Sequence, residues 1–159
     1  MKKARRFAFL LFVILIAIIG VTGMPTGYAE EKSAVFDAHG TGVRYHFTDT
    51  DMDFNFGSLV VGAATNRGIE IGEAFYAASQ IKDGDAASWQ KEWYLLAQRT
   101  EARGLQSLEQ GHKVSARDQL FRAAYYYRIS LLAILPDDSR LLDRANKSRN
   151  LMKMAGELF

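Results

Sequence analysis

The acidic residues with the most regular spacing are Asp49, Asp51 and Asp53, whose alternate positions suggest a calcium-binding loop. An EF-hand loop requires a glycine at its sixth position and a glutamate at its twelfth. Counted from Asp49, those positions hold Phe54 and Val60. The pattern therefore fails, and the sequence predicts a solvated turn here rather than a metal site.

Motifs for nucleophilic catalysis and for cofactors are missing from the sequence. A nucleophile elbow needs G-x-S-x-G, and Ser58 follows Gly57 without the second glycine at the required place. There is no P-loop, G-x-G-x-x-G or H-E-x-x-H motif, and the chain has no cysteine for a disulfide or a thiolate metal site. We therefore assign no catalytic residue, no cofactor and no metal.

Aromatic residues gather in two stretches, 89–94 and 125–127. Trp89 and Trp93 lie four positions apart, so on a helix they would share one face and pack in a core. An alternative interpretation is that some of these rings line a pocket for an apolar or aromatic ligand. Three successive tyrosines cannot all face one way on a helix. Periodicity favours packing, and the pocket-lining candidates are Trp89, Trp93, Tyr126 and Tyr127.

The first two elements that carry these residues are predicted to be helices. The first spans about 71–81, and the second starts after a cap at Asp85 and ends near Gly111. Gly104 lies in the apolar stripe of the second helix, where a glycine costs helix stability. We expect it to permit the close approach of a neighbouring helix.

Two further helices are predicted towards the end of the sequence. The third begins at Ser115, which together with Asp118 resembles a capping box, and it ends at Pro136. The fourth covers about 140–158, after a cap at one of residues 137–139. Since short connections make such helices antiparallel neighbours, we expect a bundle of about four antiparallel helices and a mainly α fold.

The sequence before these helices is less regular. Residues 43–47 alternate apolar and polar side chains, as in a short half-buried strand. The predicted organisation is therefore a leader at 1–29, an irregular segment with a short strand at 30–69, and a helical domain at 70–159.

The first 29 residues have the pattern of a secretory signal peptide. Basic residues at positions 2–6 precede an apolar run, and small residues precede a cleavage point after Ala29. The alternative is an uncleaved membrane anchor, but the run at 7–21 is shorter than the roughly 20 residues that a spanning helix prefers. We expect an exported protein, periplasmic or extracellular, with contact to a membrane only if this segment is retained.

The charge balance changes once this leader is set aside. It holds four of the 20 Lys and Arg residues and none of the 18 Asp and Glu residues, so residues 30–159 carry a formal net charge of −2. No basic surface for a nucleic acid is expected from such a balance. The remaining length suits one domain.

A resemblance to a known family rests mainly on the third predicted helix. The stretches that carry it are 111–118 (GHKVSARD) and 121–128 (FRAAYYYR), supported by 71–74 (IGEA), 88–89 (SW) and 92–93 (EW). Together they resemble the N-terminal helical cap domain of a group of α/β hydrolases. That group includes the 2,6-dihydroxypseudooxynicotine hydrolases, the fungal polyketide-shortening hydrolases and the fermentation/respiration switch protein.

The resemblance implies a role in substrate gating. In that family the helical segment precedes or covers an α/β-hydrolase domain and helps to form the substrate pocket, while the serine, acid and histidine lie in the domain that follows. The implied function is therefore the cap of an exported serine hydrolase, inactive alone, whose catalytic domain is either a separate partner or has been lost. The alternative is a stand-alone extracytoplasmic helical interaction module.

Overall fold

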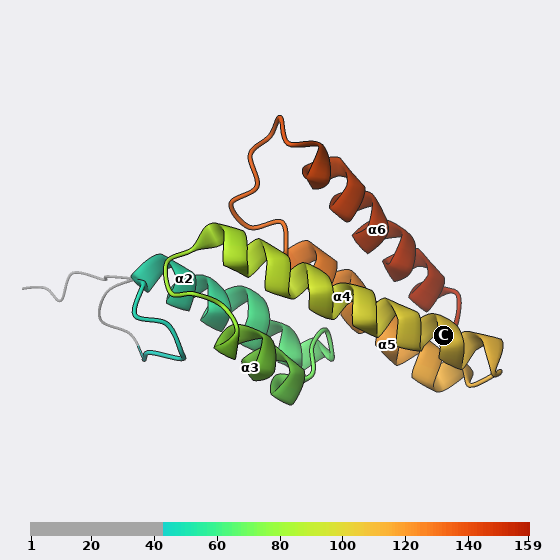
Figure 1. The fold of residues 1–159 in the computed structure, drawn as a ribbon. Coiled ribbons are helices and arrows are strands. Elements are labelled where there is room, and N and C mark those ends of the chain that lie inside the picture. The colour runs from blue at the N-terminus through green and yellow to red at the C-terminus, as the bar shows by residue number, and fades with distance from the viewer. Residues whose placement is uncertain (1–42) are drawn as a thin grey trace, which may run out of the picture. The chain divides into compact units, whose positions relative to one another are not determined.

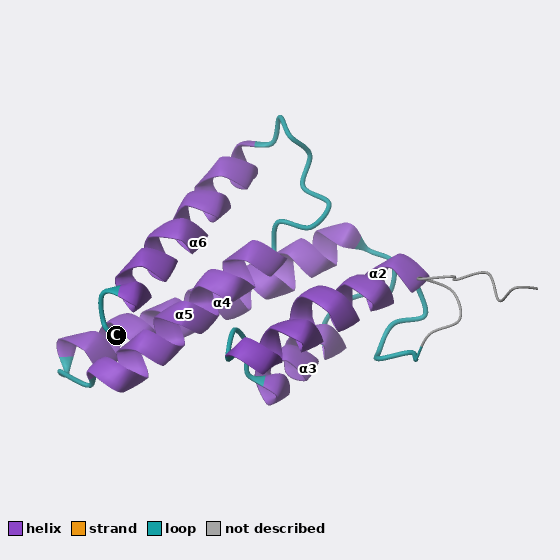
Figure 2. Cartoon of the chain, turned by 180° about the vertical axis from the view of Figure 1, so that it is seen from behind, coloured by secondary structure: helices purple, strands orange, loops and turns teal. Residues whose placement is uncertain are grey.

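The structure is a computed structural model that describes residues 43–159, and all regular elements in this part are helices (Figures 1 and 2). The predicted mainly α fold is therefore confirmed. The predictions of a signal peptide or membrane anchor fall on residues that lie outside the described part. Within residues 43–159, no helix has the length and apolar character needed to cross a bilayer.

The first helical stretch changes its winding twice. It consists of the α-helix α2 (Thr50–Asn55), a π-helical segment η1 (Phe56–Val60) and a 3-10 segment η2 (Val61–Asn66). The stretch ends where Arg67 adopts a left-handed conformation with φ of 64°. The amide of the next residue, Gly68, then donates to the carbonyl oxygen of Ala63 at 2.9 Å, which satisfies a free helix-end acceptor.

The predicted strand at 43–47 is wrong, because this segment has no partner strand in the described part of the chain. Its amides at Tyr45, His46 and Phe47 donate to the carboxylate of Asp53, at distances from 2.7 to 3.2 Å. The predicted solvated turn at Asp49–Asp53 is wrong as well. Asp49 caps helix α2 by accepting from the amide of Met52 at 2.8 Å, and Asp53 is buried inside that helix.

The next two helices agree with the prediction. Helix α3 spans Ile71–Ser79 and helix α4 spans Ala86–Glu109. The side chain of Asp85 caps α4 as expected, accepting from the amides of Ala87 and Ser88 at 2.9 and 3.3 Å. Helix α4 contributes Trp89, Trp93, Leu96 and Ala97 to the core.

Helix α5 spans Lys113–Ile129, so both predicted ends of the third helix were misplaced. At its start, His112 occupies the cap position and Ser115 lies inside the first turn. At its end, the helix stops seven residues before Pro136, where a side chain from α4 and the side chain of its own cap residue bind its last carbonyl groups. Trp89 Nε1 donates to the carbonyl of Ile129 at 3.0 Å, and Ser130 Oγ donates to the carbonyl of Tyr127 at 2.7 Å.

Helix α6 spans Ser139–Gly156 and is capped by Asp138, whose side chain accepts from the amide of Arg140 at 2.9 Å. Consecutive helices from α3 to α6 run in opposite directions (Figures 1 and 2), as expected for short connections. Helices α4 and α5 approach each other closely at Gly104, where an added Cβ would lie 2.8 Å from a methyl carbon of Leu120. The predicted use of Gly104 for close helix approach is confirmed.

Candidate functional site

A groove of about 580 Å³ opens between the irregular helical stretch and the end of α5 with the loop that follows it. Its floor is mainly apolar, and three larger polar side chains contribute to its walls. The described residues that line it are Ser58, Leu59, Gly62, Ala63, Asn66, Tyr125, Arg128, Ile129, Leu131, Leu132 and Ala133. A concave surface with an apolar floor and few polar groups is typical of a small-molecule site.

Irregular backbone forms two sides of this groove. Ser58 and Leu59 belong to the π-helical segment η1, a type of winding that often occurs at functional sites. On the opposite side, Ala133 has a φ of 58°, a left-handed conformation that is unfavourable for a residue with a Cβ. Both departures from regular helix therefore lie in the lining of the groove.

Besides Ser58, the polar side chains of the groove are Asn66, Tyr125 and Arg128. Asn66 Nδ2 donates to the hydroxyl oxygen of Tyr125 at 3.0 Å. Gly68 packs against the face of the same ring, since a Cβ there would lie 2.9 Å from three of its carbon atoms. Arg128 is exposed and forms no ion pair with any described residue.

The four aromatic residues proposed from the sequence as pocket candidates lie in the core. Trp89, Trp93, Tyr126 and Tyr127 are each at most 1% exposed. The ring centroids of Trp89 and Trp93 are 5.6 Å apart, and those of Trp93 and Tyr126 are 6.1 Å apart. Trp89 also borders a second, smaller cavity of about 210 Å³ beside helix α2. In the larger groove the aromatic side chain is Tyr125, the first of the three successive tyrosines.

A hydrogen-bond network around Tyr126 holds α3 to α4 and α5. Its hydroxyl donates to Glu73 at 2.9 Å and accepts from the amide of Glu70 at 3.0 Å, while Glu73 pairs with Arg103. Burial, helped by the nearby Glu73 carboxylate, raises the pKa of Tyr126 well above its usual range. The hydroxyl therefore stays protonated near neutral pH, and its role is to join helices.

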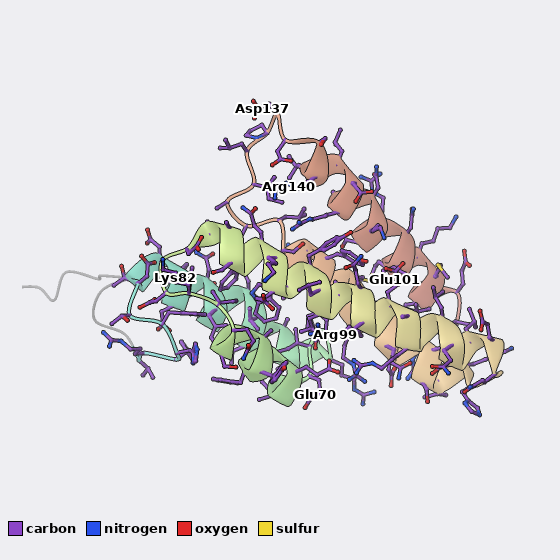
Figure 3. The ribbon with its side chains drawn as sticks, viewed as in Figure 1. Glu70, Lys82, Arg99, Glu101, Asp137 and Arg140 are labelled. Carbon is purple, nitrogen blue, oxygen red and sulfur yellow. The ribbon has the colours of Figure 1, made fainter. Side chains whose placement is uncertain are left out.

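A second network joins α6 to the bundle through the buried Arg144. Its Nη1 donates to the carbonyl of Gln90 at 2.9 Å and to that of Ser130 at 3.1 Å, and its guanidinium lies 4.4 Å from the ring centroid of Tyr94. Nearby, Lys147 approaches Glu101 at 3.8 Å, and Figure 3 shows Glu101 on the side of α4 towards α6. The contact to Ser130 holds one carbonyl group at the start of the loop that borders the groove.

The groove lacks the groups that hydrolysis would require. Ser58 lines it, but none of the described lining residues is a histidine or an acid that could activate a serine. Within residues 43–159, no three His, Asp or Glu side chains are grouped so that they could hold a metal ion. Among the described lining residues, no serine is therefore paired with a base.

Comparison with known proteins identifies relatives of this chain. No family model matches it. The hydrolyase poxO of Penicillium oxalicum is 41% identical over 78 residues, which are 48% of this chain and 18% of that protein. The 20-hydroxy-prefusarin hydrolase of Gibberella moniliformis is 36% identical over 100 residues, 61% of this chain and 24% of that protein. The alpha/beta hydrolase xenA of Xenoacremonium sinensis is 31% identical over 108 residues, 68% of this chain and 25% of that protein.

The predicted resemblance to α/β hydrolases is therefore confirmed. Its relatives include fungal α/β hydrolases that match only part of this chain, and the chain spans about a quarter or less of their length. The matched region of this chain therefore corresponds to a portion of these hydrolases.

Proposed function

Starting from this similarity to α/β hydrolases, we propose that residues 43–159 form the helical cap of an exported serine hydrolase. In this proposal the cap supplies one wall of the substrate site, and a catalytic domain that these residues do not contain supplies the serine, the acid and the histidine. The proposed partner is therefore an α/β-hydrolase catalytic domain. Export is proposed from the basic, apolar and small-residue order of residues 1–29.

The observation that carries the proposal is the groove beside η1. A cap must present a concave apolar surface to the substrate, and the lining of this groove is mainly apolar with a few polar groups. The groove is built from backbone that departs from regular helix, which a simple structural bundle would not require.

Exposed apolar side chains on α3 support contact with a second domain. Ile71 and Phe75 lie one turn apart on the same face of this helix and are 42% and 38% exposed, and the adjacent Tyr76 is 63% exposed. Apolar residues gathered on one face often mark an interaction surface. A stand-alone module would have less reason to expose them.

A graft experiment tests the proposal. The segment of the 20-hydroxy-prefusarin hydrolase that matches this chain would be replaced by residues 43–159, and a version with the segment deleted would serve as the control. We expect the graft to fold, to react with a fluorophosphonate serine probe and to hydrolyse p-nitrophenyl acetate, because the grafted helices would pack on the catalytic domain in place of the original segment.

The deletion control should lack much of this activity, since the apolar surface of the catalytic domain beneath the cap would be exposed to water. A graft that folds yet is no more active than the deletion control would contradict the proposal. Such a result would favour the stand-alone interaction module.

A further inference from the structure

The rim of the groove carries hydrogen-bond donors that a purely apolar ligand would leave unused. We propose that the groove binds an elongated apolar molecule ending in a single anionic group, such as a carboxylate. The inference deepens the proposed function, on which its relevance to a substrate depends. The binding itself is a property of this chain and requires no catalytic domain.

The apolar part of such a ligand matches the size and floor of the groove. A volume of about 580 Å³ lies within the range of roughly 300–1,000 Å³ that small-molecule sites occupy. Leu59, Ile129 and Leu132 supply aliphatic surface from both sides. An alkyl chain laid between them would leave water and bring its methylene groups into contact with these side chains.

The anionic end of the ligand is indicated by the charges at the rim. Arg128 lines the groove and has no ion-pair partner among the described residues. The hydroxyl oxygen of Tyr125 already accepts from Asn66, so its own proton is free to be donated. None of the described lining residues is acidic, and an anion would therefore meet donors without a repelling carboxylate.

The position of Tyr125 is fixed by its neighbours. Gly68 contacts one face of the ring and admits no larger side chain, and the ring of Phe121 lies 5.2 Å away between centroids. Because the phenol is held in place before binding, little conformational freedom would be lost when a carboxylate arrives. The phenol donor of Tyr125 is thus arranged in advance.

Isothermal titration calorimetry on the full chain tests this inference, with decanoate, octanoate and decanol as probes below their micelle-forming concentrations. We expect saturable 1:1 binding of decanoate and binding of decanol about tenfold weaker, because decanol lacks the charge that Arg128 would pair with. Octanoate should bind several-fold more weakly than decanoate, since it buries two fewer methylene groups.

Three variants locate the site. Arg128→Gln should weaken decanoate binding about tenfold and leave decanol binding unchanged. Gly62→Phe should abolish binding of both, because an added Cβ at Gly62 meets only one atom within 4 Å and a ring there would extend into the groove. Arg99→Gln is the matched control, since Arg99 (labelled in Figure 3) is exposed on α4 and does not line the groove.

The outcomes separate this inference from the proposed function. Absence of saturable binding, or binding that Arg128→Gln and Gly62→Phe leave unchanged, would overturn the inference. Neither result would alter the graft experiment, which uses p-nitrophenyl acetate, an ester without an anionic group. An inactive graft would likewise leave the binding result standing.

Discussion

Asp53 shows how one side chain determines the course of the chain around it. Its carboxylate accepts from three successive amides in the segment before α2, and it is only 7% exposed. Burial raises the pKa of Asp53, but the three amide donors and the charge of Arg44 outweigh burial and hold it below its usual value. This carboxylate consequently stabilises the fold most when it is ionised.

We predict that Asp53→Asn lowers the free energy of unfolding by roughly 1–3 kcal/mol at pH 7, because a neutral amide accepts these bonds less well. The folded-state pKa is depressed, so the stabilisation is present above the unfolded pKa of about 3.9 and is lost as pH falls through the folded value. Urea unfolding of both proteins from pH 7 to pH 2.5 should show their stabilities converging in acid.

Asp51→Asn is the control for this comparison. Asp51 is exposed in the same helix, and its replacement should change stability by about 0.5 kcal/mol or less. A gap between wild type and Asp53→Asn that stays constant across the pH range would contradict the role given to the ionised carboxylate.

At the scale of helices, the sequence predicted those features that depend only on neighbouring residues. Asp85 capped α4 as expected, because a cap depends on amides only two or three residues away. The end of α5 could not be predicted in the same way. It is set by Trp89 and Arg144, which reach the carbonyls of Ile129 and Ser130 from distant parts of the chain.

The burial pattern around helix α6 departs from simple periodicity for a related reason. Leu142 in α6 and Phe159 beyond its end are 69% and 86% exposed, whereas Arg144 is buried. A prediction from periodicity places an arginine in solvent. Here the carbonyl acceptors and the ring of Tyr94 compensate the free-energy cost of burying the guanidinium charge. Such compensation is visible only once the helices are assembled.

The contact between α4 and α5 at Gly104 gives a prediction at this scale. Gly104→Ala should lower the free energy of unfolding by about 1 kcal/mol, since overpacking against the buried Leu120 costs roughly 1–3 kcal/mol and the gain in helix propensity is about 1 kcal/mol. Thermal and urea unfolding would measure the change.

Gly156→Ala is the matched substitution, because a Cβ at Gly156 in α6 would meet no atom within 4 Å. It should leave stability unchanged or raise it by up to about 1 kcal/mol. Equal changes in stability for the two substitutions would show that the close contact at Gly104 does not destabilise the alanine variant.

For the whole molecule, the sequence was informative about ancestry and fold class and less so about the site. The stretches 111–118 and 121–128 indicated α/β hydrolases, and the relatives bear this out. The groove was not predicted, because its walls come from an irregular stretch and a loop that have no periodic pattern. One signal was present: three successive tyrosines could not all face the core, and Tyr125 is the one that lines the groove.

The central claim, that these helices form a wall of a substrate site, is tested most directly by the specificity of the graft. The measurement is kcat/KM of the graft, with and without Gly62→Phe, for p-nitrophenyl decanoate and p-nitrophenyl acetate. If the groove holds the acyl chain, the substitution should lower the value for decanoate about tenfold or more and leave that for acetate nearly unchanged. Equal effects on both esters, or no effect on either, would contradict the claim.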